Sequence, residues 1–367
     1  MRRFIALFVF AISVSLIAQV SHAQSGQSLY EAAKKRFEAG DRTNVFRDYV
    51  KACELNYGDA CYEVGVAYIG PGEGQNFATA YLNFDKGCRL NNAAACEKTG
   101  NFLFDGNGVG ESKIASRGAY QKACNGNHPR GCFLLATMQY LAQGGPKDLM
   151  AARASSEKSC RLKNARGCNY AGFMQRKGEG GAKNLTAALT SYQTACNGNI
   201  PAACNVLGVM HQNGEATAVN STLARTYFQK ACDADDSYGC DNLGDLYNDG
   251  KGTAKDMVKG NAAYQKGCDL GRPDSCYQVG YSAHYGRETA IDYAKARIAY
   301  EKACNDDNGR SCNNLGVLYA DGKGVTKNNA KALEYYTKAC DLKNGIACRN
   351  VGDFYNDGRA GRHSSIA

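Results

Sequence analysis

The chain of 367 residues contains no tryptophan, only five prolines and only five histidines. Its 18 cysteines never form a Cys-x-x-Cys motif, which argues against zinc sites. Cys-x-x-Cys-His is missing too, which argues against attached haem. The formal charge of +9 is spread along the chain without a dense run of lysine or arginine, so no nucleic-acid site is indicated. We therefore expect no metal, no other cofactor and no nucleic-acid partner.

Long apolar segments are also lacking after the first 23 residues. Those residues begin with two arginines, continue without charge from Phe4 to Val20, and end on the small residues Ser21 and Ala23. This order is typical of a cleaved signal peptide, with an uncleaved membrane anchor as the alternative. Gln24 stands where a lipoprotein would have cysteine. We expect an exported chain, periplasmic or secreted, without membrane insertion after signal cleavage.

Cysteine is abundant and recurs at a fixed period. Each pair encloses seven residues, and successive pairs recur every 36 residues after a first interval of 35. Such a period is typical of a helical repeat array. In an exported chain we expect nine local disulfides, because the turn between two helices brings each pair together. The expected pairs are Cys53 with Cys61, Cys88 with Cys96, Cys124 with Cys132, Cys160 with Cys168, Cys196 with Cys204, Cys232 with Cys240, Cys268 with Cys276, Cys304 with Cys312 and Cys340 with Cys348.

Two helices per repeat follow from the residues around each pair. Helix B ends at the first cysteine and carries an aromatic residue four positions earlier in eight of nine repeats, with Ser156 as the exception. Helix A follows and carries glycine four positions after the second cysteine in eight of nine repeats, with Ala136 as the exception. Glycine within a helix costs about 1 kcal/mol relative to alanine, so we expect a neighbouring helix to approach closely there. Pro129, Pro201 and Pro273 mark starts of helix A.

These patterns predict an all-α fold, a right-handed α/α solenoid of helical hairpins with a period of 36 residues and one disulfide per repeat. The A helices are expected to line its concave side. The predicted divisions are a signal peptide at 1–23, an N-terminal hairpin at 24–52, the solenoid at 53–357 and a polar tail at 358–367.

Stretches such as YYTKACDLKNGIACRNVGDFYNDG and YQKACNGN resemble Sel1-like repeats, which are relatives of tetratricopeptide repeats. The nine Cys-x7-Cys loops at this period resemble the Helicobacter cysteine-rich protein family. The resemblance covers the whole mature chain and implies an exported, disulfide-bridged α/α solenoid. It implies either protein recognition, as in the wider repeat superfamily, or penicillin binding with weak β-lactamase activity. The tail GRAGRHSSIA departs from the pattern, since it does not resemble a closing helix.

Fragments of β-lactamase motifs occur as SSEK (155–158), YLN (81–83) and KTG (98–100). However, Lys158 and Gly100 occupy positions that recur in the repeats, and the motifs stand in reversed order. Coincidence is therefore the better interpretation, and we assign no catalytic residue. β-Lactam hydrolysis, with β-lactam binding, stays the alternative function.

The exposed side of helix A is the candidate binding surface. It carries the residues two, five and nine positions after each second cysteine, and we name it the A-helix face. Its residues vary between repeats, as a binding surface can. We hypothesise that it binds an extended peptide or protein segment, with cell-wall and host components as partner classes; a merely solvated face is the alternative. The predicted binding residues are Asn242, Asn314, Asn350, Tyr170, Phe173 and Tyr281.

Overall fold

The computed structural model describes residues 25–70, 75–287 and 290–359. The predicted signal peptide and most of the predicted tail lie outside these ranges. The described residues form helices and turns without a strand, so the all-α prediction is confirmed. Within them, no helix has both the length and the apolar character that crossing a membrane requires. The chain divides into two compact units, Met1–Ala195 and Cys196–Ala367.

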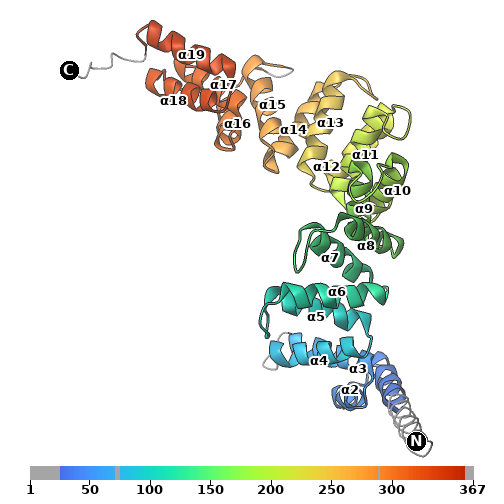
Figure 1. Ribbon diagram of the computed structural model, residues 1–367. Helices are drawn as coiled ribbons and strands as arrows, with labels where there is room; N and C mark the ends of the chain where they lie inside the picture. Colours follow the sequence, from blue (N-terminus) through green and yellow to red (C-terminus); the bar gives the residue numbers. More distant parts are fainter. Residues whose placement is uncertain (1–24, 71–74, 288–289, 360–367) are drawn as a thin grey trace, which may run out of the picture. The chain divides into compact units, whose positions relative to one another are not determined.

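The first unit is a series of helical hairpins, in which each helix packs on the next (Figure 1). It opens with a helical stretch over residues 25–38. The helices that follow are α2 (Val45–Glu54), α3 (Gly58–Ile69), α4 (Phe77–Arg89), α5 (Ala93–Asp105), α6 (Lys113–Asn125), α7 (Pro129–Tyr140), α8 (Leu149–Arg161) and α9 (Ala165–Lys177). Helix α10 (Leu185–Asn197) spans the division between the units.

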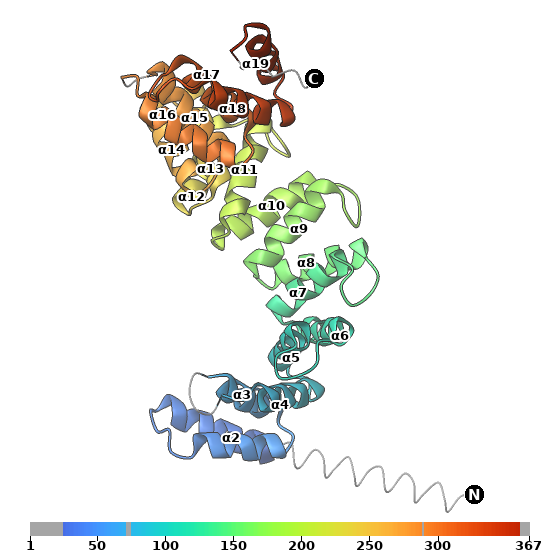
Figure 2. The same ribbon diagram turned by 90° about the vertical axis from the view of Figure 1, so that its left-hand side faces the viewer.

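The second unit repeats the same arrangement (Figure 2). Its helices are α11 (Pro201–Asn213), α12 (Ser221–Asp233), α13 (Ser237–Asp249), α14 (Met257–Asp269), α15 (Pro273–Tyr285), α16 (Tyr293–Asn305), α17 (Gly309–Asp321), α18 (Asn329–Asp341) and α19 (Gly345–Asn356). From α3 to α19 the odd-numbered helices are the predicted A helices and the even-numbered ones the B helices. Neighbouring A helices also contact each other within a unit, as α7 contacts α9 and α13 contacts α15.

Short-range chemistry sets where the helices begin and end. Most B helices begin after Asn, Asp or Ser, whose side chain accepts the amide hydrogen three residues on, as Asn76 does from Thr79. Six A helices end at a glycine with φ between 64° and 77°. These are Gly106, Gly178, Gly214, Gly250, Gly286 and Gly322. Pro129, Pro201 and Pro273 occupy the first turn of α7, α11 and α15, as expected.

One disulfide per repeat closes the turn from helix B to the next helix A, with Cα–Cα distances of 4.3–4.8 Å. The pairing in the structure is the pairing that the spacing predicted. The bridges join Cys53 to Cys61, Cys88 to Cys96, Cys124 to Cys132, Cys160 to Cys168, Cys196 to Cys204, Cys232 to Cys240, Cys268 to Cys276, Cys304 to Cys312 and Cys340 to Cys348. Among the described residues no cysteine is free.

The backbone of these turns is left-handed at one recurring position. The third residue after each first cysteine has a positive φ, for example Asn56 with φ of 63°. Asparagine, aspartate and glycine fill seven of these nine positions because they tolerate this conformation best. Gly58, two residues after Asn56, is already the first residue of α3.

The recurring glycine of helix A receives the recurring aromatic ring of helix B. A Cβ atom at Gly244 would lie 2.5 Å from the Tyr264 ring, and one at Gly280 would lie 2.6 Å from the Tyr300 ring. Seven hairpins repeat this contact, each at 3.0 Å or less. The predicted close approach is therefore that of a ring rather than of a second backbone. The pairs are Gly65 with Phe84, Gly100 with Tyr120, Gly172 with Tyr192, Gly208 with Phe228, Gly244 with Tyr264, Gly280 with Tyr300 and Gly316 with Tyr336.

The two exceptions to this pattern occur in one hairpin. Ala136 on α7 replaces the glycine, and Ser156 on α8 replaces the aromatic residue. Both side chains are fully buried. The alanine methyl group can be accommodated because serine is much smaller than a ring, so the two departures compensate each other.

A second interior position varies in the same paired way. Ser155 donates to Gln139 at 2.9 Å, and Ser191 donates to Gln175 at 2.8 Å, each within one hairpin. In the α11/α12 hairpin the same positions hold His211 stacked on Tyr227, with ring centroids 5.4 Å apart. The interior therefore keeps matched pairs even where the residue types change.

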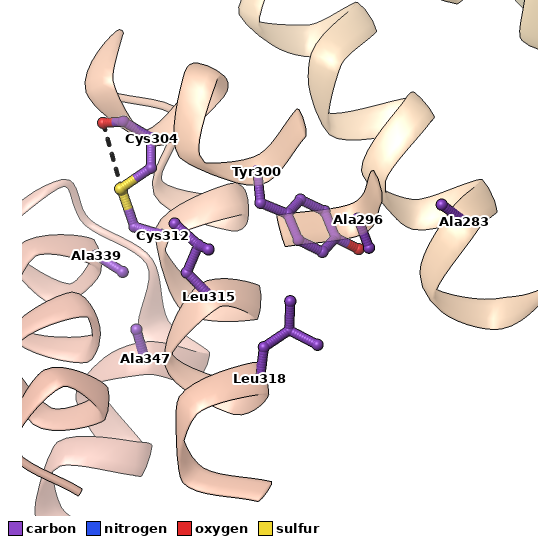
Figure 3. Close-up of a cluster of buried hydrophobic side chains, with 9 residues drawn as sticks. All are labelled: Ala283, Ala296, Tyr300, Cys304, Cys312, Leu315, Leu318, Ala339 and Ala347. Carbon is purple, nitrogen blue, oxygen red and sulfur yellow. Dashed lines mark hydrogen bonds between the residues drawn. A yellow bond between two sulfur atoms is a disulfide. The ribbon is translucent and has the colours of Figure 1, made fainter. Parts of the chain in front are cut away.

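The Cys304–Cys312 disulfide continues into an apolar core. In Figure 3 the Tyr300 ring lies beside Ala296 and is directed toward the helix that carries Ala283. The Cys312 sulfur lies 3.6 Å from the Cys304 carbonyl oxygen, and Leu315 and Leu318 extend the cluster along α17. All of these side chains are at most 4 % exposed, so the disulfide and the ring anchor the same core.

Candidate binding face of the A helices

The structure distributes the six predicted binding residues over both units. Tyr170 and Phe173 lie on α9 in the first unit. Tyr281 lies on α15, and the three asparagines lie on α13, α17 and α19, in the second unit. All six side chains are partly exposed, as a binding role requires.

In the first unit the A-helix face carries an aromatic cluster. Tyr170 and Phe173 stack with ring centroids 6.3 Å apart, and Tyr140 of α7 meets Tyr170 edge-on at 5.5 Å. Burial raises the pKa of the Tyr170 hydroxyl, so this side chain stays neutral. Lys147 Nζ lies 4.9 Å from the Tyr140 ring centroid. Sequence reasoning missed Tyr140 because it stands eight positions after Cys132, outside the positions two, five and nine that defined the face.

In the second unit two of the predicted asparagines join neighbouring repeats. Asn242 Nδ2 donates to Asn205 Oδ1 at 2.8 Å, and Asn350 Nδ2 donates to Asn313 Oδ1 at 2.9 Å. Asn313 in turn donates to Asn314 at 3.3 Å. We call these five side chains the asparagine ladder. Each of these bonds uses one amide hydrogen, so further donor and acceptor capacity remains for a ligand.

Helix α15 presents three tyrosines at helical spacing. Tyr277, Tyr281 and Tyr285 are successive neighbours, with ring centroids 5.8 Å and 4.6 Å apart. The Arg310 guanidinium carbon lies 4.5 Å from the Tyr277 ring centroid, and that of Arg287 lies 4.6 Å from the Tyr281 ring centroid. Tyrosine and arginine are the residue types enriched at binding hot spots. Sequence reasoning missed Tyr277, although the i, i+4, i+8 spacing of the three tyrosines was readable.

Carboxylates occupy the A-helix face of α13. Burial raises the pKa of Asp245, which accepts a hydrogen bond from Tyr264 at 2.5 Å. Burial also raises the pKa of Asp241, which accepts from Ser275 at 2.7 Å. Asp249 pairs with Lys251 at 2.8 Å beside the C-terminal end of the helix. These aspartates are engaged in structural contacts.

A pocket of about 490 Å³ lies in the first unit where residues 25–38, α2 and α3 meet. Aromatic and aliphatic side chains form its walls, and Glu63 and Val66 of α3 contribute from the A-helix face. Sequence reasoning missed it because the first hairpin lacks the cysteine used for the alignment. Its walls are Tyr30, Phe37, Val45, Phe46, Tyr49, Val66 and Ala67.

The β-lactamase-like fragments lie on three different helices, α4, α5 and α8. Ser155 of SSEK is 9 % exposed and donates to Gln139, as part of the hairpin interior. Lys98 of KTG lies 3.9 Å from Glu97 on its own helix. These contacts give no support to a catalytic serine, in line with the interpretation as coincidence.

A family model described as the Sel1 repeat matches residues 58–92, 201–236, 237–271, 273–308 and 309–344. Each match begins at or next to the first residue of an A helix and includes the following B helix. The chain is a Sel1-repeat protein. Residues 93–200, outside these matches, fold into three more hairpins of the same Sel1-like design, each with its disulfide. The predicted resemblance is thereby confirmed.

Several solved structures are similar to this Sel1-repeat protein. The protective antigen c5321 of uropathogenic Escherichia coli, with an SLR fold, is 21% identical, with 94% of this chain and 83% of that chain covered and a TM-score of 0.67. A Sel1 repeat protein from Oxalobacter formigenes is 17% identical, with 92% and 93% covered and a TM-score of 0.67. Cysteine rich protein B of Helicobacter pylori is 27% identical, with 46% and 95% covered and a TM-score of 0.24. A search of curated proteins found no match.

Proposed function

We propose that this Sel1-repeat protein is an exported scaffold that binds extended peptide segments of partner proteins through its A-helix face. The observation that carries the proposal is an interior Gly–aromatic contact that is kept in most hairpins, beneath a face that changes from repeat to repeat. The Gly–aromatic contact recurs in seven hairpins, whereas the face changes from aromatic on α9 to polar on α17. Repeat scaffolds of this type serve as protein-interaction surfaces, and their extended faces suit long ligands.

The two units supply different contacts in this proposal. Tyr170 and Phe173 offer stacked rings to an apolar or aromatic ligand side chain. The asparagine ladder supplies amide donors and acceptors that match a peptide backbone. Tyr281 adds a ring whose outer side is flanked by Arg287. Neighbouring A helices contact each other within each unit, which supports a continuous track along each one.

Export rests on the disulfides and on the predicted signal peptide. Disulfides persist in oxidising compartments and are rare in the cytosol. Nine bridges in the described residues, one per repeat, therefore favour folding outside the cytoplasm. The predicted site of action is the periplasm or the exterior of the cell.

Selection from a random peptide library on the oxidised chain 24–367 tests the proposal. We expect Phe173→Ala and Tyr281→Ala each to weaken the selected peptides several-fold, because each removes exposed ring area. Ile298→Ala on helix B is the matched control, since Ile298 is 59% exposed on α16. Circular dichroism and a free-thiol assay verify folding. Equal binding by both face variants and the control would contradict the proposal.

A further inference from the structure

The pocket at the first repeat has an aromatic wall with an open entrance. Tyr30 is buried at 6 % exposure, and its ring lies 5.3 Å from that of Tyr49. Phe37 and Phe46 are 44 % and 43 % exposed, which is unusual for phenylalanine and leaves both rings available to a ligand. The pocket volume of about 490 Å³ is in the range of small-ligand sites.

One carboxylate in this pocket lacks a partner among the described residues. Glu63 of α3 is partly buried, and no hydrogen bond or ion pair from residues 25–70, 75–287 or 290–359 engages it. After burial itself, the Glu63 charge is the largest cause that raises the pKa of both Tyr30 and Tyr49, so all three groups lie close together. Burial in turn raises the pKa of Glu63. A charge in such a position is costly unless a cation pairs with it.

Among the described residues, neither basic side chain of the pocket, Lys34 or Arg42, forms an ion pair with the Glu63 carboxylate. Lys34 forms no ion pair with Glu63 within the described residues, although its charge lowers the pKa of that carboxyl. The Arg42 guanidinium carbon lies 4.7 Å from the Phe37 ring centroid, at the pocket rim. This contact shows that the aromatic wall attracts a cation. Glu38 adds a second carboxylate near Tyr49.

We propose that this pocket binds the cationic side chain of a lysine or arginine in the peptide partner. This second proposal rests on the proposed function, which supplies the peptide. The aliphatic stem packs against Phe37, Phe46 and Val66, and the charged end reaches Glu63 and the faces of the tyrosine rings. An apolar side chain would fill the same walls but would leave the Glu63 carboxylate desolvated and unpaired. The charge therefore selects a cation over an apolar residue of the same length.

The test uses fluorescein-labelled Ala-Ala-Lys-Ala-Ala and its norleucine and glutamate counterparts, titrated by anisotropy against the oxidised full chain. The lysine peptide is expected to bind about tenfold more tightly than the norleucine peptide, and the glutamate peptide more weakly still. Glu63→Gln is expected to remove the lysine preference, whereas Lys34→Gln strengthens lysine binding because it removes a competing cation. Glu111→Gln, an exposed glutamate paired with Lys113, is the control and leaves binding unchanged.

Equal affinity for the lysine and norleucine peptides, or an unchanged preference in Glu63→Gln, would overturn the cationic pocket. Circular dichroism and the urea midpoint confirm that Glu63→Gln folds. The two sets of variants distinguish a failure of the cationic pocket from a failure of the proposed function. Library peptides that respond to Phe173→Ala and Tyr281→Ala but not to Glu63→Gln would leave the A-helix face standing without this pocket. Lysine-dependent binding that ignores both ring variants would leave the pocket without the extended track.

Discussion

The interior of the hairpins and the A-helix face differ in how they vary. Inside the hairpins, Gly and an aromatic ring recur, and the departure at Ala136 is matched by Ser156. On the face, tyrosine and phenylalanine on α9 give way to asparagine on α17, although both hairpins keep the Gly–aromatic contact. Interior changes are thus constrained in pairs by packing, whereas face changes are constrained only by a ligand or by solvent.

The largest expected effect comes from removing an interior ring. Phe228→Ala should lower the free energy of unfolding of the second unit by about 3–5 kcal/mol, because the ring is fully buried against Gly208. Tyr285→Ala on the face is the control, since Tyr285 is 54% exposed and should cost well under ~1 kcal/mol. Urea denaturation followed by circular dichroism measures both. Equal costs would break the distinction between interior and face.

Two glycine-to-alanine substitutions should change the free energy of unfolding in opposite directions. Gly244→Ala should destabilise the fold by about 1–3 kcal/mol, because its Cβ would lie 2.5 Å from the Tyr264 ring. Gly352→Ala on α19 should stabilise it by up to about 1 kcal/mol, because nothing lies within 4 Å and alanine favours a helix. Thermal and urea unfolding compare the two variants. A Gly244→Ala variant as stable as the parent would remove the packing explanation.

A substitution in the asparagine ladder should have a smaller effect, on both the free energy of unfolding and peptide binding. Asn242→Ala removes the bond to Asn205 and should cost about 0.5–1.5 kcal/mol of unfolding free energy. It should also weaken library-selected peptides if the ladder holds their backbones. Asn261→Ala on helix B serves as control for amide loss, since it accepts a hydrogen bond from Ser282 away from the ladder. Peptide binding that falls equally in both variants would reject a ligand role for the ladder.

The smallest expected effect is on how the stability of the second unit depends on pH. Burial lowers the pKa of His211, so the folded state resists protonation of a side chain whose unfolded pKa is about 6.5. The stability that this neutral imidazole contributes is present above that pH and is lost as the pH falls through the lowered pKa. His211→Gln, the residue type of α7 and α9 at this position, should reduce the acid sensitivity of the second unit. Urea midpoints of the parent and the variant at pH 7 and pH 5 measure this sensitivity. If the midpoint falls by the same amount between the two pH values in both proteins, His211 is not its source.

The fixed period allowed most of the fold to be predicted from the sequence. Helix identity, glycine helix ends and one disulfide per repeat all depend on contacts within a repeat. Contacts between repeats were harder to predict. A lysine stands two positions before the first cysteine in eight of nine repeats. Its contact lies outside its own helix, as Lys338 Nζ donates to the Cys304 carbonyl of the preceding B helix at 2.7 Å. The two ladder bonds between repeats join residues 37 apart, and no pattern within one repeat contains them.

Hydrogen–deuterium exchange on the oxidised chain, with and without a library-selected peptide, tests the central claim most directly. The account predicts ligand-dependent protection in A helices, notably α9, α13, α15 and α17, and protection of α3 when the peptide carries a lysine that Glu63 recognises. Protection confined to the B helices, such as α12, α14 and α16, would contradict it.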